Sequence, residues 1–301
     1  MAKRSIMHML DPMIHNSPFD INMAVDAGYE VIVPYQNVQL EQVSGLTQDA
    51  IFSRGPAGVK KTGMFIGGRD IGLAMDMLEA AKNAMEGPFQ ISVLADPSGA
   101  FTTAAALVAC VERELKKHFD QDLSGIRAVV FGGTGPVGLA TAVIAAELGA
   151  ETTIVDHFSI DTALEYAEEA KRRYGVDLRA TTAASDADKA RLLSNADVVF
   201  CTAKAGIQVL SAPVLADAKQ LKVAGDVNAV KPLGIEGVKL MHAGEPLIHA
   251  TASPNAVGIG ALAIGDIKYR LQHELLEQTL TSDKAIFLDF RNAIDEARKL
   301  V

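Results

Sequence analysis

A glycine-rich turn between a buried strand and a helix constrains this chain more than any other feature. The apolar segment 127–131 is followed by Gly133, Gly135 and Gly138 in the spacing GxGxxG, and the segment 139–148 has a helical pattern. Such a turn lets a pyrophosphate approach the backbone, and the free N–H groups of the helix that begins there attract its charge. The sequence therefore predicts a dinucleotide site in a parallel α/β sheet, with a purely structural glycine turn as the alternative.

A carboxylate at the end of the next predicted strand extends this site. Asp156 lies 18 residues past Gly138, where the last side chain of the second strand meets the adenosine ribose. A carboxylate there accepts hydrogen bonds from both hydroxyls of NAD and repels the 2′-phosphate of NADP. The adjacent His157 offsets some of that repulsion, so the use of both nucleotides stays open. In the alternative interpretation Asp156 caps the following helix.

The predicted cofactor site takes in the whole turn and further strand ends. In an open parallel sheet, ligands bind at the carboxyl ends of the strands. The residues expected to bind the cofactor are Gly133, Thr134, Gly135, Pro136, Val137, Gly138, Asp156, His157, Ala203, Lys204, Asp226 and Asn228. Those from Ala203 onward should line the nicotinamide side.

The length and the order of predicted elements fit two domains. Strands and helices alternate over the first hundred of the 301 residues, and the pattern restarts after Leu123. Helices predicted at 258–278 and 283–300 carry an apolar stripe that needs a partner surface, so we expect them to return to the first domain. The prediction is an α/β protein: an N-terminal α/β substrate domain (1–105 plus 268–301) and a Rossmann-like, doubly wound parallel sheet (106–267).

Composition disfavours several classes of function. The net charge is −9 and no basic face is clustered, which disfavours nucleic acid as a partner. We expect no membrane span, because no apolar run reaches about 18 residues. The first five residues lack the apolar segment of a secretory signal, which predicts a soluble, cytoplasmic protein. The seven histidines lack metal-ligand spacing, so no metal site is expected.

Further motifs are those of a known family. They lie at 17–20 (Ser-Pro-Phe-Asp), 35–38 (Tyr-Gln-Asn-Val), 65–68 (Phe-Ile-Gly-Gly), 87–89 (Gly-Pro-Phe), the loop at Asp96 with 102–106, 228–235 (Asn-Ala-Val-Lys-Pro-Leu-Gly-Ile) and 258–268. Together with the glycine turn, they make the chain resemble the methylene-tetrahydromethanopterin dehydrogenases of one-carbon metabolism nearly end to end. The chain is more distantly similar to the methylene-tetrahydrofolate dehydrogenases.

This resemblance implies a reaction and its partners. It implies the oxidation of methylene-tetrahydromethanopterin, a reduced pterin, to the methenyl form by hydride transfer to NAD or NADP, without a metal, in the oxidation of formaldehyde. It also implies a cytoplasmic homo-oligomer. Because two nitrogens stabilise the resulting cation, no proton has to move, and the protein mainly supplies placement. The NADP-dependent branch has Arg just after the second strand, whereas Asp156 and His157 here point to NAD or to both nucleotides.

Candidate substrate residues follow from the pterin edge, whose ring N–H and exocyclic amine call for a carboxylate or for paired carbonyl groups. The candidates are Asp20 and Asp96, with Ser17, Thr102 and Thr103 beside them in the sequence. The structural alternatives are a helix-dipole partner for Asp20, a turn residue for Asp96 and caps for Thr102 and Thr103. Lys268 matches a lysine that the family places near the pterin. The resemblance makes it the catalytic candidate, with a role in binding or electrostatic tuning, and a surface helix residue is the alternative.

The sequence is also compatible with other functions. The first is a methylene-tetrahydrofolate dehydrogenase, and the second is a module that senses NAD(P)H without turnover. A shikimate-type or amino-acid dehydrogenase is a third, which would need a proton acceptor. Gln39 stands where methenyl-hydrolysing relatives have a lysine after Tyr35, so we expect no cyclohydrolase activity.

Overall fold

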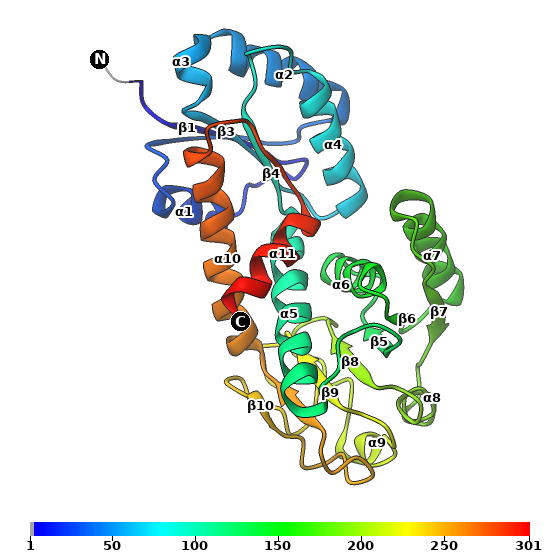
Figure 1. Cartoon of the computed structure of the whole chain (residues 1–301). Coiled ribbons are helices and arrows are strands. Elements are labelled where there is room, and N and C mark those ends of the chain that lie inside the picture. Colours follow the sequence, from blue (N-terminus) through cyan, green and yellow to red (C-terminus); the bar gives the residue numbers. More distant parts are fainter. Residues whose placement is uncertain (1–2) are drawn as a thin grey trace. The chain divides into compact units, whose positions relative to one another are not determined.

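The computed structural model describes residues 3–301 (Figure 1). Its contacts divide the chain into two compact units. Unit 1 comprises the chain up to Thr102 together with Tyr269–Glu296, and unit 2 comprises Thr103–Lys268 together with Ala297–Val301. Both units are built on sheets that are parallel except for one strand, which confirms the predicted α/β class.

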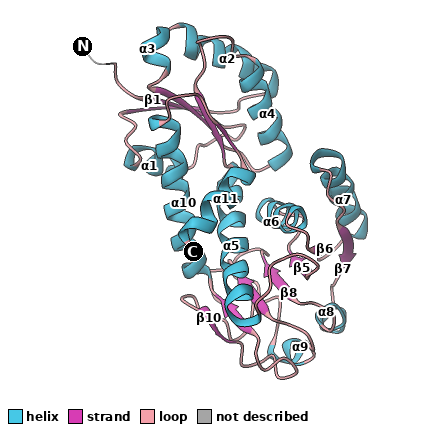
Figure 2. Ribbon diagram, in the orientation of Figure 1, coloured by secondary structure: helices cyan, strands magenta, loops and turns pink. Residues whose placement is uncertain are grey.

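Unit 1 contains a five-stranded parallel sheet in the order β12-β4-β3-β1-β2. Helices cover both faces of a parallel sheet, and the central strand β3 is buried along its whole length. Figure 2 shows the strands between α2 and α4 on one face and α1 and α10 on the other. The elements are β1 (Ile6–Leu10), α1 (Pro18–Asp26), β2 (Val31–Tyr35), α2 (Leu40–Phe52), α3 (Gly55–Val59), β3 (Thr62–Ile66), α4 (Ile71–Asn83), β4 (Ser92–Ala95), η1 (Pro97–Gly99) and β12 (Phe287–Leu288).

Three helices belong partly to each unit. They are α5 (Ala100–Phe119), α10 (Ala261–Thr281) and α11 (Phe290–Leu300). Within unit 1, the C-terminal segment is tied to the first part of the chain by two buried hydrogen bonds. Gln272 Nε2 donates to Asp20 Oδ1 at 2.6 Å, and the Tyr29 and Thr279 hydroxyl oxygens lie 2.8 Å apart. The predicted return of the C-terminal helices to the first domain is thereby confirmed.

The starts of the two C-terminal helices differ from the prediction. Residues 257–259 form strand β11, and α10 begins only at Ala261. The segment before Phe290 forms β12, because the backbone N–H of Val93 donates to the carbonyl oxygen of Ile286 at 2.8 Å and starts a ladder along β4. A short strand satisfies these backbone groups as well as a helical turn does. The hydrophobic pattern of so short a segment does not distinguish a strand from a helix.

Unit 2 contains a seven-stranded sheet in the order β10-β11-β9-β8-β5-β6-β7. Only β10 is antiparallel to its neighbour, so the doubly wound parallel sheet is confirmed. Its elements are β5 (Arg127–Phe131), α6 (Pro136–Glu147), β6 (Glu151–Asp156), α7 (Ile160–Tyr174), β7 (Arg179–Thr182), α8 (Asp186–Leu193), β8 (Val198–Cys201), α9 (Ala212–Ala216), β9 (Val223–Asp226), β10 (Ala243–Pro246) and β11 (Val257–Ile259).

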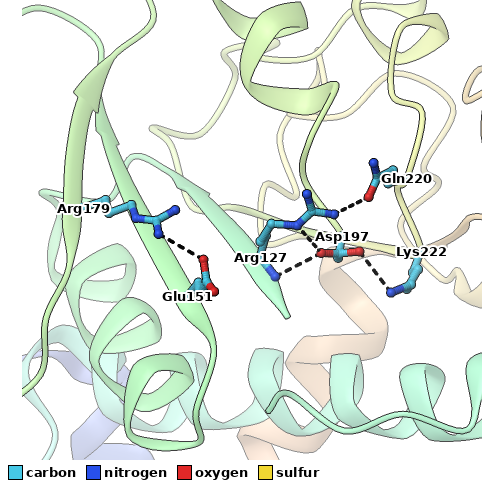
Figure 3. A network of polar contacts seen from close by, with 6 residues as sticks. All are labelled: Arg127, Glu151, Arg179, Asp197, Gln220 and Lys222. Carbon is cyan, nitrogen blue, oxygen red and sulfur yellow. Dashed lines mark hydrogen bonds and ion pairs between the residues drawn. The ribbon is translucent and has the colours of Figure 1, made fainter. Parts of the chain in front are cut away.

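A network of charges joins the amino ends of the strands in unit 2 (Figure 3). Asp197, which precedes β8, accepts from Arg127 Nε at 2.8 Å and from Lys222 Nζ at 3.0 Å. Burial alone would raise the pKa of Asp197, but the hydrogen bonds from Arg127 and Lys222 outweigh burial and hold that pKa below its usual value. These contacts hold together the amino-terminal ends of the strands. The glycine-rich turn lies at the opposite, carboxyl-terminal ends.

Candidate nucleotide site and substrate residues

The glycine-rich turn begins one residue earlier than the sequence pattern indicates. Gly132, directly after β5, has the left-handed φ of +75°, and a Cβ there would lie 2.8 Å from the backbone of Ala203. Gly135 is the N-cap of α6 with φ −78°, and Pro136 and Val137 form the first turn of the helix. The tight turn expected of Gly133 is therefore made by Gly132, because only glycine adopts this conformation without a steric cost.

The three glycines of the GxGxxG spacing meet different surroundings. A Cβ on Gly133 would lie 2.7 Å from Ile154 Cβ of β6, and a Cβ on Gly138 would lie 2.1 Å from the carbonyl oxygen of Gly132. On Gly135 the nearest atom would be 3.4 Å away. Gly133 and Gly138 are thus required by packing, whereas space remains open at Gly135, where a pyrophosphate approaches in such folds.

Asp156, at the carboxyl end of β6, is already engaged by three donors. Its Oδ1 accepts from the backbone N–H groups of Phe158 at 2.8 Å and Ser159 at 2.9 Å, and its Oδ2 accepts from the Thr134 hydroxyl at 2.7 Å. Burial would raise the pKa of Asp156, but these hydrogen bonds and the nearby His157 outweigh burial and lower it. The cap of α7 is Ser159, so Asp156 shapes the loop before the helix and stays ionised at neutral pH.

A cavity of about 490 Å³ adjoins Asp156 within unit 2. It lies at the carboxyl ends of β5, β6 and β8, and its lining combines apolar and cationic side chains. The lining residues are Phe131, Gly132, Val155, Asp156, His157, Phe158, Ala183, Lys189, Ala203, Lys204, Ile207, Gln208 and Val209. Of the predicted cofactor residues, the structure thus brings Asp156, His157, Ala203 and Lys204 together around one pocket.

Sequence reasoning missed the apolar part of this pocket. Phe158 is 90% exposed, and its ring packs edge-on against His157 with centroids 4.5 Å apart. Ile207, from the loop after β8, is 49% exposed. Large apolar side chains left open to solvent inside a cavity suit a flat aromatic base. An aromatic residue two positions after the end of a strand was the available signal for Phe158.

Asp226 and Asn228 differ from the expectation that they line the nicotinamide. Asp226 is 1% exposed and accepts from the backbone N–H groups of Asn228 and Ile235 at 2.9 and 3.0 Å. Asn228 Oδ1 accepts from Gly206 N at 3.1 Å, and its Nδ2 donates to the carbonyl oxygen of Pro232. Both side chains face inward because the loops after β8 and β9 need them as hydrogen-bond partners. Asn228 holds the loop that carries Lys204, and Asp226 holds the loop after β9.

The substrate candidates of unit 1 also have structural partners. Ser17 is the N-cap of α1, and Asp20, in the first turn, is buried against Gln272. Asp96 is fully buried, where it accepts from Phe101 N at 2.9 Å and from the Thr102 hydroxyl at 2.6 Å. These contacts agree with the structural alternatives: the Asp20 carboxylate joins α1 to α10, and the Asp96 carboxylate holds the turn before α5.

Two further candidates fall in unit 2 by their contacts. Thr103 is half-buried in α5, and Lys268 is half-buried in α10 at the last residue before the chain enters unit 1 again. Neither residue lines the cavity at Asp156. Within residues 3–301 no cluster of three or more His, Cys, Asp or Glu side chains is arranged to hold a metal ion. In the same range, no helix is both long and apolar enough for a membrane crossing.

The fold and the site together define a dinucleotide-binding α/β protein of the dehydrogenase type. Shikimate 5-dehydrogenase from Listeria monocytogenes aligns with a TM-score of 0.54 over 99% of this chain and 96% of its own, at 13% identity. Quinate dehydrogenase from Corynebacterium glutamicum aligns with a TM-score of 0.51 over 98% of each chain, at 12% identity. Identities this low show a shared fold alone.

Similarity in sequence narrows this class to one family. Residues 18–98 match the model of the N-terminal region of methylene-tetrahydromethanopterin dehydrogenase. The NAD(P)-dependent methylenetetrahydromethanopterin dehydrogenase of Methylorubrum extorquens is 45% identical over 290 residues, 96% of each chain. The bifunctional protein MdtA of the same organism is 30% identical over 284 residues, 94% of this chain and 95% of its own. This protein belongs to the methylene-tetrahydromethanopterin dehydrogenase family.

Proposed function

We propose that this protein is an NAD(P)-dependent dehydrogenase that oxidises methylene-tetrahydromethanopterin to its methenyl form. The observation that carries the proposal is the 45% identity with the Methylorubrum extorquens enzyme, which extends over 96% of both chains. An alignment of this length includes the glycine-rich turn, the nucleotide cavity and the loops of unit 1. A module that only senses NAD(P)H would have no reason to keep the pterin-side loops.

The hydride transfer requires no side chain that acts as a general acid or base. A C–H bond of the methylene bridge breaks, and its electron pair and hydrogen move as a hydride to C4 of the nicotinamide. The cation that remains is shared by the two flanking nitrogens, so no proton has to be taken or given. The protein supplies orientation, with the two carbons about 3–3.5 Å apart, and this alone lowers the barrier by several kcal/mol.

The nucleotide half of the reaction falls to unit 2. The open backbone at Gly135 and the N-terminus of α6 receive the pyrophosphate, because their N–H groups and the helix dipole favour negative charge. Asp156 accepts from the adenosine ribose, and Phe158 and Ile207 offer apolar surface to adenine. This arrangement leaves the nicotinamide to the loop after β9, which Asp226 supports.

We assign the pterin half to the loops that Ser17, Asp20, Asp96, Thr102 and Thr103 shape, with Lys268 as the charged group that tunes binding. Asp20 and Asp96 are buried and hydrogen-bonded, so they act as positioning residues in this proposal. An ammonium group beside a developing cation would raise the barrier. Lys268 therefore contributes to substrate affinity rather than to the hydride step.

Reduction of NAD and of NADP, followed at 340 nm with methylene-tetrahydromethanopterin and with methylene-tetrahydrofolate, tests the proposal. We expect turnover with tetrahydromethanopterin and a much lower kcat/KM with tetrahydrofolate. Asp156→Ala should raise the KM for NAD about tenfold, because one charge-assisted hydrogen bond to the ribose is lost, and should leave that for NADP nearly unchanged. Turnover of neither pterin by a folded, NAD-binding protein would overturn the proposed function.

A further inference from the structure

The Asp156 carboxylate has less capacity for a ligand than its position suggests. An ionised carboxylate offers about four acceptor positions on its two oxygens. Three are taken by the Thr134 hydroxyl and by the backbone N–H groups of Phe158 and Ser159. One position remains, so Asp156 accepts from one ribose hydroxyl and not from the 2′- and 3′-hydroxyls together. Three occupied acceptor positions favour a single bond to the ribose over the acceptance from both hydroxyls that the sequence predicts.

The same three donors reduce the repulsion that Asp156 exerts on a phosphate. Each directs a positive dipole end at the carboxylate, and the Thr134 hydroxyl does so from the glycine-rich turn itself. His157 adds to this effect, and the pKa of Asp156 is lowered by these partners against the opposing effect of burial. Asp156 is thus a weak barrier to a ribose that carries a 2′-phosphate.

A cation without a partner faces the same cavity. Lys204 and Lys189 both belong to its lining, but Lys189 Nζ lies 3.1 Å from Asp186 Oδ1. Lys204 is exposed and takes part in none of the ion pairs found among residues 3–301. The loop around Lys204 is held in place, since Ile207 N donates to its carbonyl oxygen and Asn228 Oδ1 accepts from Gly206 N. A fixed loop with an unpaired ammonium group is suited to bind an anion.

We propose that Lys204, together with His157 from the lining of the same cavity, forms a subsite for the 2′-phosphate of NADP, and that Thr134 sets the balance between NAD and NADP through its bond to Asp156. This proposal rests on the proposed function, which it deepens. It assigns dual nucleotide use to one pocket. NAD binds through the free acceptor position of Asp156, and NADP binds through Lys204, while Thr134 keeps Asp156 from excluding the phosphate.

Binding of NAD and of NADP to three variants, measured by calorimetry without any pterin, tests this subsite. Lys204→Gln should weaken NADP about tenfold and change NAD less than about twofold, because only NADP loses a charge-assisted hydrogen bond. Thr134→Val keeps the shape of the side chain but removes its donor, so NADP should bind about three- to tenfold weaker and NAD somewhat tighter. Lys219→Gln, an exposed lysine of unit 2 outside the cavity, is the charge-matched control and should change neither.

The outcomes separate this proposal from the proposed function. Equal weakening of NAD and NADP by Lys204→Gln, or no change in NADP binding, would overturn the 2′-phosphate subsite. A Thr134→Val variant that binds both nucleotides as the wild type does, or weakens both equally, would overturn the role of Thr134. Failure of the wild type to bind NADP would overturn the whole inference. Absence of turnover with pterin, when both nucleotides bind as predicted, would refute the proposed function and leave the subsite standing.

Discussion

Replacing Gly135 and Gly138 by alanine separates contact with the ligand from packing, because the added methyl group meets different surroundings at the two positions. On Gly138 it would lie 2.1 Å from the Gly132 carbonyl oxygen and 2.7 Å from Thr202 Oγ1. On Gly135 its nearest neighbour would be the same Gly132 oxygen at 3.4 Å. One substitution therefore forces backbone to move, and the other leaves the unit as it is.

The expected losses in thermal stability and in NADH affinity follow from these distances. Overpacking costs about 1–3 kcal/mol, and a unit of this size loses about 2–4 °C in Tm per kcal/mol, so Gly138→Ala should lower Tm by about 2–12 °C. Gly135 has φ −78°, which any residue adopts, and alanine there should change stability by less than about 1 kcal/mol. The same methyl group occupies the space of the pyrophosphate, so NADH should bind at least about tenfold more weakly, equivalent to about 1.4 kcal/mol.

Two measurements on each variant distinguish a loss of stability from a loss of nucleotide affinity. Differential scanning fluorimetry without ligand gives Tm, and a fluorescence titration with NADH gives Kd. We expect Gly135→Ala to keep the wild-type Tm and lose affinity, and Gly138→Ala to lose Tm. A Gly135→Ala protein that binds NADH as tightly as the wild type would refute the reasoning, because the pyrophosphate would then not approach the backbone at Gly135.

Three other substitutions, the first with a matched control, have defined outcomes. Asp197→Asn should destabilise the protein by about 1–3 kcal/mol at pH 7 in urea unfolding, whereas Glu151→Gln, whose ion pair is exposed, should cost less than about 1 kcal/mol. Because folding lowers the pKa of Asp197, its contribution should be present above about pH 4 and be lost as the pH falls through the folded-state pKa. Asp96→Ala removes the acceptor of three hydrogen bonds and should destabilise unit 1 by about 2–4 kcal/mol, visible as a lower Tm. Lys268→Ala should raise the KM for the pterin more than it lowers kcat, and the reverse pattern in steady-state kinetics would give the lysine a part in the hydride step.

The sequence predicted the features that depend on local pattern. The buried strand 127–131 and Asp156 at the end of the next strand lie where the pattern indicated, and the tight turn after the first strand is displaced by only one residue, to Gly132. These signals are strong because a strand, a tight turn and a helix follow each other within a few residues. The alternation of strands and helices predicted both parallel sheets for the same reason.

What the sequence did not predict depends on partners far along the chain. The hydrogen bond between Thr134 and Asp156 joins residues 22 positions apart, and the sequence around either residue does not predict it. Asp226 and Asn228 were expected to face the ligand because they lie at the end of a strand. In the structure their side chains are instead buried as hydrogen-bond partners of the loop backbone. Residues 287–288 form a strand because β4 offers a free edge, which only the folded unit reveals.

The division of unit 1 between the two ends of the chain has a consequence for biosynthesis. Strand β12 and the residues that bind Asp20 and Tyr29 emerge from the ribosome only after all of Thr103–Lys268, a delay of about 10–30 s at bacterial elongation rates. Until then β4 is a bare sheet edge, the kind of surface on which nascent chains associate wrongly. Ribosome-bound chains arrested near residue 268 should therefore need a chaperone, whereas those released after synthesis of β12 should not.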